Sequence, residues 1–376
     1  MVQNQEAQLS LSLSPAILAY EPTFRLTSSL TRNLENIDRE RWAFDRLIID
    51  PGYEGWLRRR AYVRSGHHSL HIEGNQLSQE RVMRILEAQI DEVPQEREAE
   101  EVRSWNRAMH FVDQVSQSAE IPISSLLIRH MHQLMLGPND RSKRPGEFRL
   151  GVALVRHPLT RRVVYAGPPA GDVPDLVHQF EQWLSEHVDK LHAVLIAGIA
   201  HLRLVEIHPF VDGNGRTARA LTTLVLQRLG YSFNKLLALD RYFDYDLVKY
   251  CDAIGDSVGE SFREKRDITP WLEYFTFALS VEISLASNEM IDLRRAMENW
   301  HARLSAKGYS ERHQDSLAYA AINGSIRPRD VARLFHVSSV TAGQDLKRLE
   351  LMGLLKSEGY GRARRYTPAE GMMDRV

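Results

Sequence analysis

The feature that most constrains the fold is an apolar run, residues 193–207, followed at once by a polar loop and a second helical pattern. The run is too short, and contains too many ionisable side chains, to span a bilayer, so it predicts a buried helix. Beyond the loop, apolar residues recur at helical spacing, at Leu221, Leu224, Val225 and Leu229. Gly230 is placed to end this second helix. We therefore expect the chain to organise around two core helices joined by the loop.

Composition limits the number of domains and the kinds of partner that the chain can have. The chain has 376 residues, 43% of them hydrophobic, which suffices for two or three domains that each bury a core. Its 48 basic and 49 acidic side chains give a formal net charge of -1, so overall charge favours no particular partner. The single cysteine, Cys251, excludes an intrachain disulfide. The first residues lack the basic segment of a secretory signal, so a cytoplasmic location is the default expectation.

The first 300 residues are mainly helical in pattern. A helix capped by Ser78 is predicted from an apolar stripe at Val82, Ile85, Leu86 and Ile90. Residues 98–112 and 124–136 also show helical spacing. Residues 150–165 differ, because two short β-rich arms flank a turn at 157–160, which predicts a small exposed hairpin. On its own sequence this hairpin is either a flap beside a site or a plain connection.

The C-terminal part changes character after about residue 310. Residues 329–335 form a short amphipathic pattern, and after a tight turn Ser339 is placed to cap a second helix that runs to about Met352. Two short arms, residues 354–356 and 364–366, then predict a hairpin. This order of elements resembles a winged-helix domain.

DNA contact by this domain is one of two open alternatives. Residues 327–366 contain nine Lys or Arg and four Asp or Glu, a local charge of +5. Three of the arginines lie on the expected wing, at Arg362, Arg364 and Arg365. The expected recognition helix, however, carries a glycine and an acidic residue besides its two basic ones. Many winged helices serve only protein packing, so either role fits the sequence.

Residues 208–219, which read HPFVDGNGRTAR, outline a phosphate-handling site. They combine a base, a carboxylate and two guanidiniums with two glycines that can expose backbone N–H groups. The helix that follows would direct its N-terminus at the same point, where an anion is favoured. Spacing rather than any single residue supports this interpretation.

The same residues carry a resemblance to a known family. His-Pro-Phe-x-Asp-Gly-Asn-Gly-Arg-x-x-Arg is the signature of Fic-domain proteins, and all its fixed positions are present here. Residues 146–149 resemble the Fic segment that leads into the flap, 164–169 the second arm of the flap, and 269–271 the start of the last Fic helix. The resemblance covers roughly residues 60–285. It implies a helical core with a hairpin flap and, typically, transfer of AMP to protein hydroxyls.

The residue types fit that reaction. A hydroxyl that attacks the α-phosphate of ATP needs a base with a pKa near neutrality, and His208 is predicted to be that base. Asp212 is predicted to hold Mg²⁺ together with the phosphate oxygens. Arg216 and Arg219 would contact β- and γ-oxygens. Backbone N–H groups are predicted to surround the α- and β-phosphates at Gly213, Asn214 and Gly215. The loop is not a Walker A loop, since no Gly-Lys-Ser/Thr follows it.

A second resemblance concerns control. Residues 69–74, SLHIEG, match the Ser/Thr-x-x-x-Glu-Gly/Asn inhibitory motif of Fic proteins in which this motif precedes the core. We call this inhibitory segment the brake. Glu73 is predicted to pair with Arg219 and so to occupy the guanidinium that a productive γ-phosphate needs. Taken alone, the segment also fits an ordinary helix end, with Ser69 capping it and Gly74 terminating it.

Three further features are less specific. Family proteins often carry a Tyr-Tyr pair on the helix after the motif, and the match here is a Tyr-Cys pair that assigns Tyr250 to the adenine site. Val164 and Tyr165 of the expected flap complete the predicted nucleotide-binding residues. His67 and His71 have the i,i+4 spacing of a zinc pair, but no third ligand at metalloenzyme spacing is evident.

Together these features predict a mainly α protein with three parts. They are an N-terminal helical region that contains the inhibitory helix (1–110), a Fic core with a small hairpin flap (111–285), and a linker helix with a winged-helix domain (286–376). The predicted function is a protein adenylyltransferase that uses ATP and Mg²⁺ to modify a Ser, Thr or Tyr hydroxyl of a protein, under restraint by Glu73. Whether the protein also modifies itself stays open. Removal of AMP, transfer of another phosphate-containing group, and a nucleotide-sensing DNA-binding regulator stay open as alternatives. The resemblance also implies a homodimer, and no membrane partner is expected.

Overall fold

The computed structural model describes residues 20–44, 46, 50–87, 96–118, 120–137, 141–157, 160, 162–361 and 364–370. Its first helices are α1 (Ser28–Phe44), α2 (Pro51–His71), α3 (Gln79–Glu87), α4 (Arg97–Ser116), α5 (Ser125–Leu136), α6 (Val173–His187) and α7 (Ala193–Ile207). They are followed by α8 (Asn214–Arg228), α9 (Leu239–Tyr245), α10 (Leu247–Val258), α11 (Thr269–Ala306), α12 (Glu311–Asn323), α13 (Pro328–Phe335) and α14 (Ser339–Leu351). The predicted positions Ile90, Pro158, Leu159 and Arg362, like the start of the chain, lie outside the described residues.

The strands form two separate antiparallel pairs. The first pair is β1 (Leu154–Arg156) with β2 (Val163–Ala166), and the second is β3 (Leu355–Glu358) with β4 (Arg365–Pro368). Short 3₁₀ turns occur at η2 (Arg141–Lys143), η3 (Ala170–Asp172) and η4 (Phe233–Lys235). Over the residues that the structure describes, the protein is therefore mainly α with two small hairpins, as the sequence predicts.

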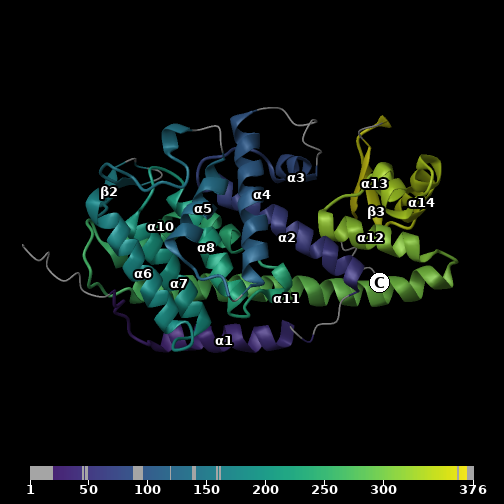
Figure 1. The fold of residues 1–376 in the computed structure, drawn as a ribbon. Coiled ribbons are helices and arrows are strands. Elements are labelled where there is room, and N and C mark those ends of the chain that lie inside the picture. The colour runs from purple at the N-terminus through teal and green to yellow at the C-terminus, as the bar shows by residue number, and fades with distance from the viewer. Residues whose placement is uncertain are drawn as a thin grey trace, which may run out of the picture.

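Helices α7 and α8 pack against each other in the middle of a helical bundle, which confirms the prediction from the apolar run (Figure 1). Helix α7 is buried on nearly all sides, so its even hydrophobicity suits a central position. A Cβ at Gly198 would lie 2.9 Å from Phe275 of α11, so a glycine permits the close approach of α7 and α11. Gly230 has φ 79°, the left-handed conformation expected for the residue that ends α8.

One hydrophobic core joins the helices from α1 to α11, and a second core lies around the end of α11 and the C-terminal elements. Figure 1 shows α11 running the length of the molecule, with α12 to α14 and β3 at one end. The predicted boundaries 110/111 and 285/286 fall inside the continuous helices α4 and α11. These boundaries follow from the positions of the motifs, which delimit a functional unit. A helix, by contrast, continues for as long as its apolar face is covered by other elements.

The C-terminal part contains the two predicted helices, α13 and α14, and then the predicted hairpin, β3–β4; α12, which precedes them, was not predicted. Ser338 rather than Ser339 caps α14, because its Oγ accepts the N–H of Thr341 at 3.1 Å. Two basic side chains of this part form local ion pairs: Lys347 pairs with Glu350 at 2.7 Å, and Arg365 pairs with Glu358 on the facing strand. The local charge of +5 already counts these acidic partners, so it is unchanged by the pairing.

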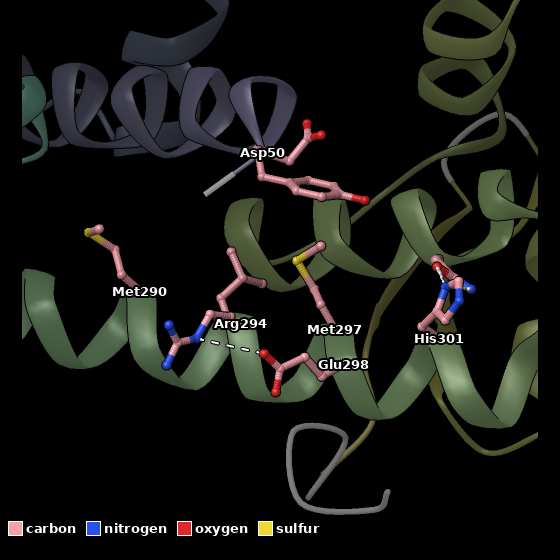
Figure 2. A pocket seen from close by; sticks show the side chains of 9 residues that line it. Asp50, Met290, Arg294, Met297, Glu298 and His301 are labelled. Carbon is pink, nitrogen blue, oxygen red and sulfur yellow. Dashed lines mark hydrogen bonds and ion pairs between the residues drawn. The ribbon is translucent and has the colours of Figure 1, made fainter. Parts of the chain in front are cut away.

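A cavity of about 430 Å³ lies where the start of α2 meets α11 and α12 (Figure 2). Its walls are formed by Asp50, Tyr53, Met290, Leu293, Arg294, Met297, Glu298, His301 and Gln314. None of these residues belongs to the predicted site, so the cavity is separate from the 208–219 loop. In the described ranges, every helix is too short or too polar to cross a membrane.

Candidate active site

The 208–213 loop is bounded by two left-handed residues. His208 ends α7 with φ 49°, and Gly213 begins α8 with φ 76°. These two turns reverse the chain between the core helices and leave the N-terminus of α8 facing the loop. A Cβ at Gly213 would also lie 3.0 Å from Leu136, so this position is restricted by both backbone and space.

Side chains inside the motif hold the loop in shape. Asn214 Oδ1 accepts the N–H of Phe210 at 2.9 Å, and its Nδ2 donates to the carbonyl of Phe210 at 2.9 Å. Thr217 Oγ1 donates to the carbonyl of Gly213 at 2.8 Å. The amide of Asn214 is therefore engaged in the loop itself, and only its backbone N–H remains for an anion.

Arg149 fixes the loop from outside, a role that the sequence did not reveal. This side chain is buried and donates to the carbonyls of His208 at 2.8 Å, Gly151 at 2.7 Å and Pro168 at 2.6 Å. It thereby ties the motif to the base of the β1–β2 hairpin. The resemblance at 146–149 marked this segment, but no local pattern showed which carbonyls it would bind.

His132 is a second support that was missed. Its ring stacks on Phe210 with centroids 3.7 Å apart, Nε2 lies 2.9 Å from the carbonyl of Asp212, and Nδ1 accepts the N–H of Gly146 at 2.9 Å. Burial lowers the pKa of His132 to about 4, so the ring stays neutral with both nitrogens in use. It lies far from the motif in sequence, and only the fold brings the two together.

His208 has the geometry of a base. Its Nδ1 lies 3.1 Å from the carbonyl of Val205, and since a carbonyl only accepts, the hydrogen resides on Nδ1. The neutral ring then carries its lone pair on Nε2. Burial lowers the pKa of His208 below its ordinary value, which keeps the base form populated at neutral pH.

Asp212 is an ionised carboxylate in a cationic setting. It lies 2.7 Å from Lys143 Nζ and 3.6 Å from an Arg216 nitrogen, and it accepts the N–H of Gly213 at 2.7 Å. Burial opposes ionisation, but the hydrogen bond from Lys143 and the charge of Arg216 outweigh it and lower the pKa of Asp212. Lys143 was not predicted as a partner of this carboxylate.

The fit to Mg²⁺ depends on this one side chain. Within the described ranges, no group of three or more His, Cys, Asp or Glu residues is arranged to hold a metal. A single carboxylate suffices for Mg²⁺ only where phosphate oxygens and water supply the other ligands. Asp212 therefore fits a metal that arrives with a nucleotide.

Arg219 is the most heavily engaged residue of the motif. Its guanidinium is buried and donates to Glu73 Oε1 at 3.0 Å, to Ser69 Oγ at 3.0 Å and to the Ser69 carbonyl at 2.8 Å. Asp240 Oδ1 lies 3.0 Å from its Nε and was not predicted. Burial alone would lower the pKa of Arg219, but the nearby carboxylates, first Glu73, outweigh it and raise that pKa. Arg219 is therefore permanently charged and already paired.

Glu73 also lies over the start of α8. A Cβ at Gly215 would be 2.6 Å from Glu73 Oε1, so the carboxylate lies directly against the first turn of α8. Backbone N–H groups at a helix N-terminus favour an anion at this place. Glu73 thus occupies both the guanidinium and the anion position that a phosphate would use.

The remaining predicted residues lie at the edges of the site or below it. Tyr165 is buried and its hydroxyl donates to the Glu206 carbonyl at 2.7 Å, while Val164 is 43% exposed on the hairpin. Tyr250 is buried with its hydroxyl 2.9 Å from His201 Nε2, in an aromatic cluster beneath Arg219. The structure therefore gives the rings of Tyr165 and Tyr250 supporting contacts rather than an open face for adenine.

The hairpin presents apolar side chains to solvent beside the loop. The exposed ones are Leu150, Val152, Leu154, Val163 and Val164, together with Val211 of the motif. Among the described residues the β1–β2 pair is a two-stranded sheet with a register irregularity after Val155, and Ala166 at the end of β2 also bridges Ser261. An exposed edge of a small sheet is a place where an added strand can pair.

Comparison with known proteins agrees with this geometry. Residues 122–226 match the model of the Fic/DOC family. These residues form a Fic domain. The proteins named "Protein adenylyltransferase Fic" from Drosophila melanogaster and Drosophila sechellia are each 35% identical over 235 residues, which is 60% of this chain and 45% of the relative. The chain thus spans about half the length of the curated relatives it matches.

Solved structures share the fold over more of the chain. A Fic family protein from Desulfovibrio desulfuricans G20 aligns with a TM-score of 0.58 and 21% identity over 93% of this chain and 98% of that one. Fic-1 from C. elegans aligns with a TM-score of 0.56 and 25% identity over 69% of this chain and 72% of that chain. The Desulfovibrio match supports the helical architecture beyond the Fic domain itself.

Proposed function

We propose that this protein is a Mg²⁺-dependent protein adenylyltransferase that Glu73 restrains. The observation that carries the proposal is the convergence of His208 Nε2, the N-terminus of α8 and the Arg219 guanidinium on one loop. The Drosophila relatives named for this activity support the same reaction. A protein hydroxyl is the acceptor and ATP is the donor.

The reaction is a single displacement at the α-phosphorus. The oxygen of a Ser, Thr or Tyr side chain forms the new P–O bond while His208 Nε2 takes its proton. The bond between the α-phosphorus and the oxygen that links it to the β-phosphorus breaks, and pyrophosphate leaves. The first N–H groups of α8 and the guanidiniums of Arg216 and Arg219 would stabilise the charge that develops on the phosphates. Mg²⁺ bound at Asp212 would neutralise further charge on the leaving pyrophosphate.

Restraint follows from the contacts of Glu73. A γ-phosphate that binds Arg219 must replace the Glu73 carboxylate, since both need the same donor. ATP in its productive position and Glu73 in its described position therefore exclude each other. Ser69 and Asp240 keep the guanidinium in place when Glu73 leaves.

The acceptor protein would bind along the exposed hairpin. Its backbone can add as a strand to the β1–β2 pair, next to the apolar side chains and the His208 loop. Backbone pairing places a hydroxyl side chain near His208 without requiring one particular sequence around it.

Labelled nucleotides test the reaction. Glu73→Gly protein with α-labelled ATP is expected to transfer label to protein, whereas γ-labelled ATP is expected to transfer none. Addition of His208→Ala should remove the transfer while ATP binding persists. Label from the γ-position would show phosphate transfer instead, and release of AMP from a modified protein without any forward transfer would show the removal reaction.

A further inference from the structure

The end of α2 is also held in place by contacts that do not involve the pair of Glu73 and Arg219. His68 Nδ1 lies 2.7 Å from Asp244 Oδ2, and His71 Nδ1 lies 2.8 Å from Asp244 Oδ1. The Asp244 side chain is only 9% exposed. One carboxylate of α9 thus receives two imidazoles from the segment that contains Ser69 and Glu73.

Helix α9 makes a second contact with α2 one turn earlier. Asp240 Oδ2 accepts the hydroxyl of Ser65 at 2.6 Å, and its other oxygen lies 3.0 Å from Arg219 Nε. The residues of α2 that meet α9 through polar contacts are Ser65, His68 and His71, which recur every three residues along one face. Asp240 and Asp244 therefore both contact the last two turns of α2, on the same face of that helix.

Helix α9 is itself fixed to the body of the protein. Arg241 forms two hydrogen bonds to the carboxylate of Glu282 on α11, at 3.0 and 2.9 Å, and Phe243 is fully buried. Forked pairs of this kind set orientation as well as distance. The end of α2 is thus placed on a fixed support.

We propose that Asp244 is a positioning residue of the brake. Through His68 and His71 it holds the end of α2 in the one orientation that lets Glu73 reach Arg219. The inference rests on the proposed restraint by Glu73. Without Asp244 the end of α2 keeps fewer polar contacts with α9, so Glu73 leaves Arg219 more often and a phosphate replaces it more easily. A role in folding alone would instead lower stability and raise no activity.

The test compares initial rates of AMP transfer from α-labelled ATP. Asp244→Ala is expected to raise the rate about tenfold, as the loss of hydrogen bonds to a charged group implies. Asp244→Asn should raise it less, because an amide oxygen still accepts an imidazole N–H. Asp292→Ala, which removes an exposed carboxylate of α11, should leave the rate unchanged. In the Glu73→Gly background, Asp244→Ala should add nothing, because the group that it positions is gone.

Two results would overturn the inference. One is a folded Asp244→Ala protein with the wild-type rate or less, while Glu73→Gly is faster. The other is an equal, independent gain from Asp244→Ala with and without Glu73. If Asp244→Ala does not fold, His71→Ala removes the more exposed imidazole, and an unchanged rate there overturns the proposal as well. No gain from Glu73→Gly would instead refute the brake itself, and the positioning role with it.

Discussion

The two sides of the site are held by different forces. The 208–219 loop is fixed by buried or partly buried hydrogen bonds to backbone carbonyls, from Asn214, His132 and Arg149. The end of α2 is fixed by contacts between side chains, each with one partly exposed member, since the Glu73 side chain is 29% and the His71 side chain 45% exposed. Buried backbone contacts are lost only on unfolding, whereas partly exposed side-chain contacts break and re-form in the folded state. The reactive side is therefore rigid and the restraining side is releasable.

The largest effect is expected from the base. In the Glu73→Gly background, His208→Ala should lower AMP transfer by roughly 10² to 10⁴, the usual contribution of a general base. ATP affinity by calorimetry and the thermal midpoint should stay close to those of the parent. A rate of AMP transfer within threefold of that of the Glu73→Gly protein would show that His208 is not the general base.

Arg149 tests the rigidity of the reactive side. Arg149→Leu removes the donor to the carbonyls of His208, Gly151 and Pro168, of which the Pro168 carbonyl is buried and the His208 carbonyl is partly buried. At about 1 to 3 kcal/mol for each unsatisfied group, the free energy of unfolding should fall by roughly 3 kcal/mol or more. Urea denaturation measures this loss, and a midpoint equal to that of the wild type would show that the loop has other support.

His132 makes the same side sensitive to acid. Its pKa is about 4 in the folded protein and has the ordinary value of 6.5 in the unfolded chain, so between these values the unfolded state binds more protons. Stability from this group is complete above pH 6.5 and falls as the pH is lowered toward 4, by roughly 3 kcal/mol in all. His132→Gln should lose less stability over this range in parallel urea titrations. Equal pH dependence of the two proteins would contradict the role of this ring.

The smallest effect on stability is expected on the restraining side. Glu73→Gly removes one partly exposed carboxylate, and Ser69 and Asp240 still contact Arg219. The free energy of unfolding should change by about 1 kcal/mol or less. A loss as large as that expected for Arg149→Leu would mean that the two sides are equally structural.

Sequence patterns predicted the elements that depend on nearby residues. The two core helices and the hairpin are present as expected, and the contact between Glu73 and Arg219 joins two motifs that each lie within a few residues. Short motifs can be recognised in a sequence because a single turn or loop fixes the spacing of their residues.

The residues that were missed act over long distances in the chain. His132, Arg149, Lys143, Asp240 and Asp244 each contact groups from distant segments. A lone histidine or aspartate on a helix carries no sign of its partner, because the packing of other helices decides which group it meets. The predicted domain boundaries at 110/111 and 285/286 stay predictions, and α4 and α11 continue through them.

The central claim is that the pair of Glu73 and Arg219 restrains a competent adenylyl-transfer site. The most direct measurement is the initial rate of AMP incorporation from α-labelled ATP by wild-type and Glu73→Gly proteins of equal concentration and equal thermal midpoint. The account predicts that Glu73→Gly is faster by about tenfold or more, since a charged hydrogen bond to Arg219 no longer competes with the γ-phosphate. An equal or lower rate in the folded variant would contradict it.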